Sequence, residues 1–191
     1  ATPLGLFCRG NPVALRRRSV AIVGARKAKK SLGWVRDLAA YLSLRGECIV
    51  SGGASGVDAA AHQGALSGRG LTVAYLGVPA DRFYPARNRN LFREILERGG
   101  AIASEHPPGA QTLAFEHAQR NRLIAMQAKT VVVAEAGIKS GTLGTVRWAL
   151  RLGLPVWCPP ACVKGNLEGM QAFLGAGKAR RLNDPNGLIS G

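Results

Sequence analysis

Short apolar runs rich in Val, Ile and Ala alternate along the chain with longer segments whose apolar positions recur about every three to four residues. The short runs predict buried strands, because a strand of a covered parallel sheet needs no polar side. The longer segments predict helices with one apolar face, and their regular alternation with strands is typical of an α/β fold. The expected strands are 19–23, 47–50, 71–76, 101–103, 130–135 and 155–158, and the expected helices are 32–46, 56–67, 88–98, 117–127, 143–152 and 167–174.

This pattern fits a single domain. We expect one Rossmann-like, doubly wound, mostly parallel sheet over residues 18–179, with helices on both faces and no long polar linker dividing it. Residues 1–17 and 180–191 carry Pro, Asn, Gly and charge, and we expect them to form an extended lead-in and a tail or linker.

In open sheets of this kind, ligands bind outside the carboxyl ends of the strands. The loops at 24–30, 51–55, 77–88 and 135–142 should therefore share one rim. Three of them place glycine and small polar residues between a strand and a helix, which leaves backbone N–H groups at the positive end of a helix. In any one loop the glycines would equally serve a tight turn alone. Three such loops on one rim favour the binding of phosphate.

The charge of the chain strengthens this interpretation. Its 191 residues contain 26 Lys and Arg against 11 Asp and Glu, a net charge of +15 with histidines neutral. Such an excess indicates a polyanionic partner, either nucleic acid or a membrane surface. The cations are spread from Arg9 to Arg181 rather than along one amphipathic helix, which favours nucleic acid. With no long apolar run and no signal-like amino terminus, we expect a cytoplasmic protein without membrane contact.

Several chemistries are disfavoured by the motifs. No loop ends in the Gly-Lys-Ser/Thr of a P-loop and none has the spacing of a dinucleotide fingerprint, which disfavours ATP hydrolysis and NAD chemistry. Asp58 and His62 lie four residues apart in a predicted helix, where capping and packing are the favoured roles. Cys158 and Cys162 lack the further ligands that a structural zinc requires. We expect no catalytic residue, no metal and no cofactor.

Short motifs occur at the loops and helix starts of this pattern. They are 20–26 (VAIVGAR), 51–58 (SGGASGVD) with 61–62 (AH) and 64–66 (GAL), 76–77 (LG) with 84–85 (YP), 104–105 (SE), 120–125 (RNRLIA), 133–136 (VAEA) and 140–142 (SGT). In this order they resemble the DNA-processing protein A family, also called DprA or Smf, over about residues 3–177. The resemblance implies a domain without enzymatic activity that binds single-stranded DNA, forms a homodimer and passes incoming DNA to the RecA recombinase during natural transformation. For the homodimer, Val156, Met170, Phe173 and Leu174 are a candidate apolar patch, although we expect at least two of them in the core.

The binding residues are predicted partly from chemistry and partly from the resemblance. A guanidinium at Arg26, after the first predicted strand, is suited to bidentate phosphate contact, and the family's DNA-contacting arginine occupies this position, where Ala25 replaces the usual Ser or Thr. Phe83, Tyr84 and Phe115 are equally suited to stack on bases or to anchor loops to the core. The predicted DNA- and phosphate-binding residues are Gly24, Ala25, Arg26, Ser51, Gly52, Gly53, Arg87, Phe115, Arg120, Asn121, Arg122, Lys139, Ser140, Gly141 and Thr142.

The chain departs from the family's pattern at 117–118, where His-Ala replaces Phe-Pro, and at 159–162, where Pro-Pro-Ala-Cys replaces the common Pro-Gly. The alternative function is a nucleotide-binding or nucleotide-hydrolysing protein similar to the cytokinin-activating phosphoribohydrolases. Their glycine-rich motif ends in a reacting glutamate, whereas this chain has Trp148 at that position, which removes the expected acid. A molybdenum-cofactor carrier is a third alternative, which a bound pterin would reveal.

Overall fold

The computed structural model describes residues 2–111 and 116–189, with side chains from 118 onward in the second range. These residues form one eight-stranded sheet in the order β1-β5-β4-β3-β2-β6-β7-β8. Only β1 runs antiparallel to its neighbour, and the other described pairs are parallel. The strands are β1 (Phe7–Gly10), β2 (Ser19–Val23), β3 (Cys48–Gly52), β4 (Thr72–Tyr75), β5 (Ala101–Ser104), β6 (Ala128–Val133), β7 (Val156–Cys158) and β8 (Arg180–Arg181).

Helices cover both faces of this sheet, as its alternating side chains require. Val20 and Ile22 of β2 pack against apolar residues of α1 and α2, whereas Ala21 and Val23 face apolar residues of α5 and α6. The predicted doubly wound α/β fold is therefore confirmed. The helices are α1 (Leu32–Leu44), α2 (Val57–Ser67), α3 (Arg89–Glu97), α4 (Glu116–Gln119), α5 (Asn121–Gln127), α6 (Thr142–Arg151) and α7 (Gln171–Gly175), with 3-10 turns at Pro12–Arg16, Ala86–Asn88, Glu168–Met170 and Pro185–Leu188.

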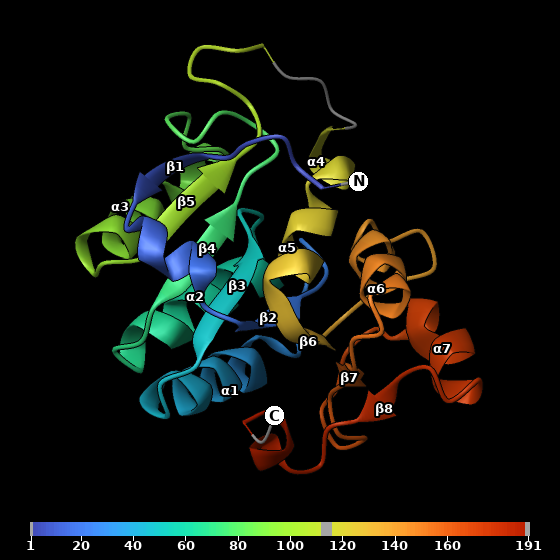
Figure 1. Cartoon of the computed structure of the whole chain (residues 1–191). Helices are drawn as coiled ribbons and strands as arrows, with labels where there is room; N and C mark the ends of the chain where they lie inside the picture. The colour runs from blue at the N-terminus through green and yellow to red at the C-terminus, as the bar shows by residue number, and fades with distance from the viewer. Residues whose placement is uncertain (1, 112–115, 190–191) are drawn as a thin grey trace.

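The topology creates a switch point beside β2. From β2 the chain adds β3, β4 and β5 on one side, and then returns to pair β6 with β2 on the other side. Figure 1 shows the consequence, with β1 and β5 at one edge of the sheet and β7 and β8 at the other. The helices that follow β2 and β6, α1 and α6, pack on opposite faces of the sheet, and a fold with this topology binds ligands at the carboxyl ends of the two strands.

The structure adds two edge strands to the six that were expected. Residues 7–10, expected within an extended lead-in, pair antiparallel with β5, and Arg180–Arg181, expected within a tail, pair with β7. All four residues of β1 are exposed, so its position depends on backbone hydrogen bonds and leaves no buried apolar pattern in the sequence. The domain boundaries themselves stay a prediction.

Two helices also differ from expectation. The helix expected at 117–127 is divided into α4 and α5 by a turn at Arg120, and the helix expected at 167–174 begins as the 3-10 turn Glu168–Met170. Val156 and Met170 lie in the core, as expected for at least two of the four candidate dimer residues, and Phe173 and Leu174 pack partly buried against it. Within the described residues, no helix combines the length and the apolar character that crossing a bilayer requires.

Candidate nucleic-acid interface

The loop after β2 lies directly against the loop after β6. The backbone N–H of Ala25 donates to the carbonyl oxygen of Glu135 at 2.8 Å. A Cβ on Gly24 would lie 2.6 Å from Cγ2 of Val57, the first residue of α2, so a side chain has no room there. The glycine allows the β2 turn to pack closely between α2 and the β6 loop, which brings the segments that follow both strands into one site.

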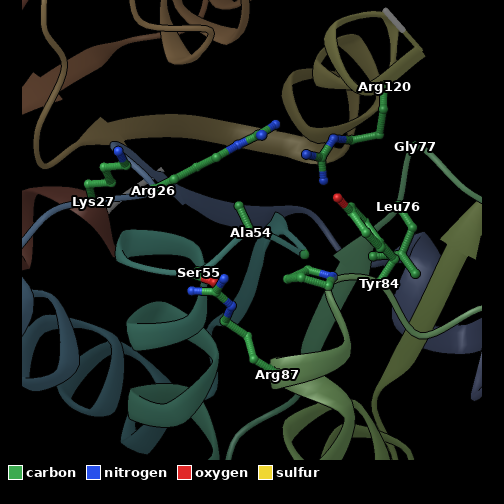
Figure 2. A pocket seen from close by; sticks show the side chains of 11 residues that line it. Arg26, Lys27, Ala54, Ser55, Leu76, Gly77, Tyr84, Arg87 and Arg120 are labelled. Atoms are coloured by element: carbon green, nitrogen blue, oxygen red, sulfur yellow. The ribbon is translucent and has the colours of Figure 1, made fainter. Parts of the chain in front are cut away.

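Two adjoining cavities open at this switch point, and they share Arg26, Lys27, Ala54 and Arg120. The first has a volume of about 240 Å³, and Figure 2 shows Arg26 extending across it in the direction of Arg120. The second has a volume of about 570 Å³ and lies between the β2 loop and the start of α6. The first is lined by Arg26, Lys27, Gly53, Ala54, Ser55, Leu76, Gly77, Tyr84, Pro85, Arg87 and Arg120, and the second adds Val23, Gly24, Ala25, Asp58, Ala118, Asn121, Ile124, Gly137, Lys139, Ser140, Gly141, Thr142 and Thr145.

The charge of this lining is mostly positive and exposed to solvent. The side chains of Arg26, Lys27, Arg87 and Lys139 are all exposed. Among the described residues that line the cavities, Asp58 is the one acidic side chain, and it is only 6% exposed. Four solvent-accessible cations around two hollows form a surface that attracts and can contact a polyanion.

Arg120 and Asp58 form a buried pair beneath the exposed cations. Arg120 is 7% exposed, and its Nη1 donates to the carbonyl oxygen of Tyr75 at the end of β4. Asp58 accepts the backbone N–H of Ala54 at 3.3 Å. Burial raises the pKa of the Asp58 carboxyl, and the Arg120 guanidinium opposes this shift. A Cβ on Gly52 would collide with both side chains, so this glycine allows both of them to lie against the backbone there.

His62 supports the same loop from within the core. Its Nε2 donates to the carbonyl oxygen of Gly52 at 2.8 Å, and its Nδ1 lies 2.7 Å from Oγ1 of Thr72. Burial lowers the pKa of His62 to about 4, so the ring is neutral at neutral pH. These contacts agree with the packing role expected for this residue. No group of three His, Cys, Asp or Glu suited to a metal ion occurs among the residues that the structure describes.

The amino terminus of α6 forms one wall of the larger cavity. Its first turn contains no acidic residue, so the positive end of the helix dipole is not neutralised there. Asn121 at the start of α5 donates through Nδ2 to the carbonyl oxygen of Gly141 at 3.0 Å, which holds the loop against α5. Lys139 and Ile138 of the same loop are exposed beside it. This arrangement of cation and helix terminus is suited to an anionic group.

Most of the predicted binding residues come together here. Ser51 and Gly52 lie behind the surface, because the Ser51 hydroxyl donates to the Ile22 carbonyl at 2.6 Å and Gly52 contacts His62. Arg122 instead lines a separate cavity with Trp148 and pairs with Glu105 at 2.5 Å. Phe115 lies outside the described residues. The predicted residues that line the two adjoining cavities are Gly24, Ala25, Arg26, Gly53, Arg87, Arg120, Asn121, Lys139, Ser140, Gly141 and Thr142.

The structure distinguishes between stacking and anchoring for two of the three aromatic residues, Phe83 and Tyr84. The Phe83 ring is half-buried against Phe92, with 5.6 Å between centroids, so it anchors its loop. Tyr84 is 49% exposed and lines the smaller cavity. The sequence left Tyr84 open between stacking and anchoring, and its exposure at the cavity is compatible with stacking. Lys27 was not among the predicted binding residues, although it belongs to the basic run after the first strand. Ala54 and Ser55 also line the smaller cavity, because they lie in the turn before α2, but neither side chain by itself indicates a binding role in the sequence.

Comparison with known proteins agrees with these features. A family model described as DNA recombination-mediator protein A matches residues 1–190. Protein Smf from Escherichia coli K12 is 39% identical over 160 residues, which are 83% of this chain and 42% of that protein. DNA processing protein DprA from Streptococcus pneumoniae R6 is 38% identical over 167 residues, covering 87% of this chain and 58% of the relative. The chain thus spans about half the length of the curated relatives it matches.

Solved structures give the same result. DNA processing protein A from Helicobacter pylori has a TM-score of 0.88 at 29% identity, covering 99% of this chain and 86% of that one. DNA processing protein A from Streptococcus pneumoniae has a TM-score of 0.82 at 35% identity, covering 97% of this chain and 65% of that one. A molybdenum cofactor carrier protein from Chlamydomonas reinhardtii has a TM-score of 0.57 at 21% identity, covering 92% of this chain and 95% of that one. At this identity the likeness shows a shared fold alone. Because the family model matches nearly its whole length, the chain belongs to the DNA recombination-mediator protein A family, also known as DprA or Smf.

Proposed function

We propose that this chain binds single-stranded DNA at the switch point, largely without regard to base sequence. The observation that carries the proposal is the convergence of Arg26, Lys27, Arg87 and Lys139 around two adjoining cavities, beside the unneutralised amino terminus of α6. Cations and backbone N–H groups contact phosphate and do not distinguish the bases. The site is therefore a contact surface for the DNA backbone.

The hollow shape favours a single strand over a duplex. A single strand can turn a base into a cavity while its phosphates remain with the cations, and Tyr84 offers an exposed ring for stacking. A duplex keeps its bases paired and presents only its outer phosphates to such a surface. The relative from Helicobacter pylori has a single-stranded DNA binding mode, which supports the same ligand for this chain.

A wider role is also part of the proposal. We propose that this chain acts as a homodimer, protects incoming DNA and loads the RecA recombinase during natural transformation in the cytoplasm. We propose binding without catalysis. In support, Trp148, at the position of the hydrolases' glutamate, lines a different cavity with Ala118, Gln119 and Arg122.

Fluorescence anisotropy tests the DNA-binding proposal. A labelled oligothymidine and a duplex of equal length are titrated with the chain, with Arg26→Glu as the test variant and Arg36→Glu, an exposed arginine of α1, as the matched control. We expect tighter binding to the single strand, a loss of at least about tenfold for Arg26→Glu, and little change for Arg36→Glu. Equal losses in the two variants would mean that net charge alone, and not this site, accounts for binding.

A further inference from the structure

Glu135 is a buried carboxylate at the centre of the switch point. It lies two residues beyond the end of β6 and is 6% exposed. It does not line either of the adjoining cavities among the described residues, so it is set back from any bound DNA. An acidic group this close to a cationic site opposes DNA binding by charge alone, and its presence therefore needs a structural reason.

The contacts of Glu135 supply that reason. Its Oε1 accepts two hydrogen bonds from Ser31, one from the backbone N–H at 3.0 Å and one from the hydroxyl at 2.7 Å. Its backbone carbonyl oxygen accepts the N–H of Ala25 at 2.8 Å. One residue thus holds both ends of the segment 25–31, which carries Arg26 and three lysines.

A third loop packs on the other side of the same carboxylate. Oε2 of Glu135 accepts the backbone N–H of Asn166 at 3.4 Å, and the Asn166 carbonyl oxygen accepts the N–H of Ala136 at 2.7 Å. A Cβ on Gly165 would lie 2.8 Å from Cγ of Glu135, so this loop lies directly against the side chain. Glu135 therefore joins the segments that follow β2, β6 and β7.

We infer that Glu135 is a positioning residue for the DNA site, which holds the segment 25–31 in its binding conformation without contacting DNA. The inference rests on the proposed function. Residues 26–30 contain four cations, which repel one another. In a loop that was free to move, this repulsion would drive the cations apart, and they would no longer be arranged to contact the same phosphate groups. Fixing the loop before DNA arrives lowers the entropy lost on binding.

A carboxylate is required because the donors approach both oxygens. Ser31 directs two donors at Oε1 while Asn166 directs one at Oε2. Glutamine has one acceptor oxygen, and its amide group would face a donor on one side or the other. Glu135→Gln therefore disconnects one of the two loops with almost no change in volume.

Charge and positioning predict opposite signs for this variant. Removing an acid near a polyanion site should tighten DNA binding if only charge matters, whereas loss of the loop contact should weaken it. We expect Glu135→Gln to weaken oligothymidine binding by about tenfold and Ser31→Ala by a few-fold, as for the loss of charge-assisted hydrogen bonds. Glu47→Gln is the matched control, because Glu47 pairs with Lys129 beside the amino end of β3.

The closing experiment combines these variants with Arg26→Ala in anisotropy titrations of the full chain, with thermal melts of each protein. If Glu135 acts through the segment 25–31, the double variant binds more tightly than the product of the two single losses predicts, and Glu135→Gln alone lowers the salt dependence of binding. Unchanged or tighter binding by both Glu135→Gln and Ser31→Ala, or fully multiplicative losses, would overturn the inference. Those results leave the proposed function standing if Arg26→Glu still weakens binding by at least about tenfold. A wild-type chain that does not bind oligothymidine overturns both.

Discussion

Arg26 and Arg120 have the same side chain and opposite surroundings. Both line the two cavities, but Arg26 is exposed, whereas Arg120 is buried, donates to the carbonyl oxygen of Tyr75 and is favoured in its charged form by the negative charge of Asp58. Among the described residues, Nε of Arg120 has no hydrogen-bond partner. The sequence identified both arginines as candidates but could not separate them, because the burial of Arg120 depends on a strand end 45 residues away in the chain. That Arg120 contacts phosphate stays a prediction.

A pH-dependent stability follows from His62. Its pKa is about 4 in the folded chain and about 6.5 when unfolded, so the unfolded state takes up more protons as the pH falls between these values. Stability from the neutral ring is complete above about pH 6.5 and is lost as the pH falls toward 4, by roughly 2 kcal/mol between pH 7 and pH 5.

Urea denaturation of the wild-type chain and of His62→Gln at both pH values measures this loss. Asp58, whose raised pKa acts in the opposite direction, is present in both proteins, so its effect cancels in the comparison. A His62→Gln chain that loses as much stability as the wild type on acidification would contradict the assignment.

At the scale of elements, the buried strands could be predicted from the sequence, because a strand covered by helices on both faces has apolar side chains on both sides and so appears as an apolar run. The strands β1 and β8 were not, since the first has only exposed side chains and the second has two arginines. The break between α4 and α5 at Arg120 was also hidden, because helical periodicity continues through it. The glycine-rich turns before α2 and α6 were correctly expected at the rim. Which loops face one another there could not be predicted, because this depends on β2 pairing with β6.

The amino terminus of α6 permits a test in which stability and binding change in opposite directions. Gly141 is exposed at the start of the helix, and a Cβ there meets nothing within 4 Å. Gly141→Asp should stabilise the chain by about 0.5 kcal/mol through the helix dipole. The same charge faces the larger cavity and should weaken oligothymidine binding several-fold.

Gly141→Asn is the neutral control of nearly equal shape, and chemical denaturation and anisotropy give the two quantities for each variant. The aspartate variant should bind clearly less DNA than the asparagine variant. Equal binding by the two would show that phosphate does not approach this helix terminus.

At the scale of the whole molecule, the net charge of +15 and the doubly wound topology together carry the proposal that a polyanion binds at the switch point. The sequence was sufficient to predict that the strand-to-helix loops share one edge, because parallel strands place their carboxyl ends together. It could not show that the segments after β2 and β6 are direct neighbours, nor that Glu135 joins them, because those facts come from the strand order and from contacts 104 residues apart. Cations elsewhere on the surface add to the long-range attraction of a polyanion.

The most direct test of the central claim is the salt dependence of oligothymidine binding by the wild-type chain and Arg26→Glu. Each phosphate contact at the switch point releases bound counterions, so log Kd should rise steeply and linearly with log salt for the wild type. The slope for Arg26→Glu should be shallower by roughly one contact, about 0.7 units for a single strand, together with weaker binding at every salt concentration. A wild-type slope near zero, or two parallel lines of equal affinity, would contradict a phosphate-binding site at Arg26.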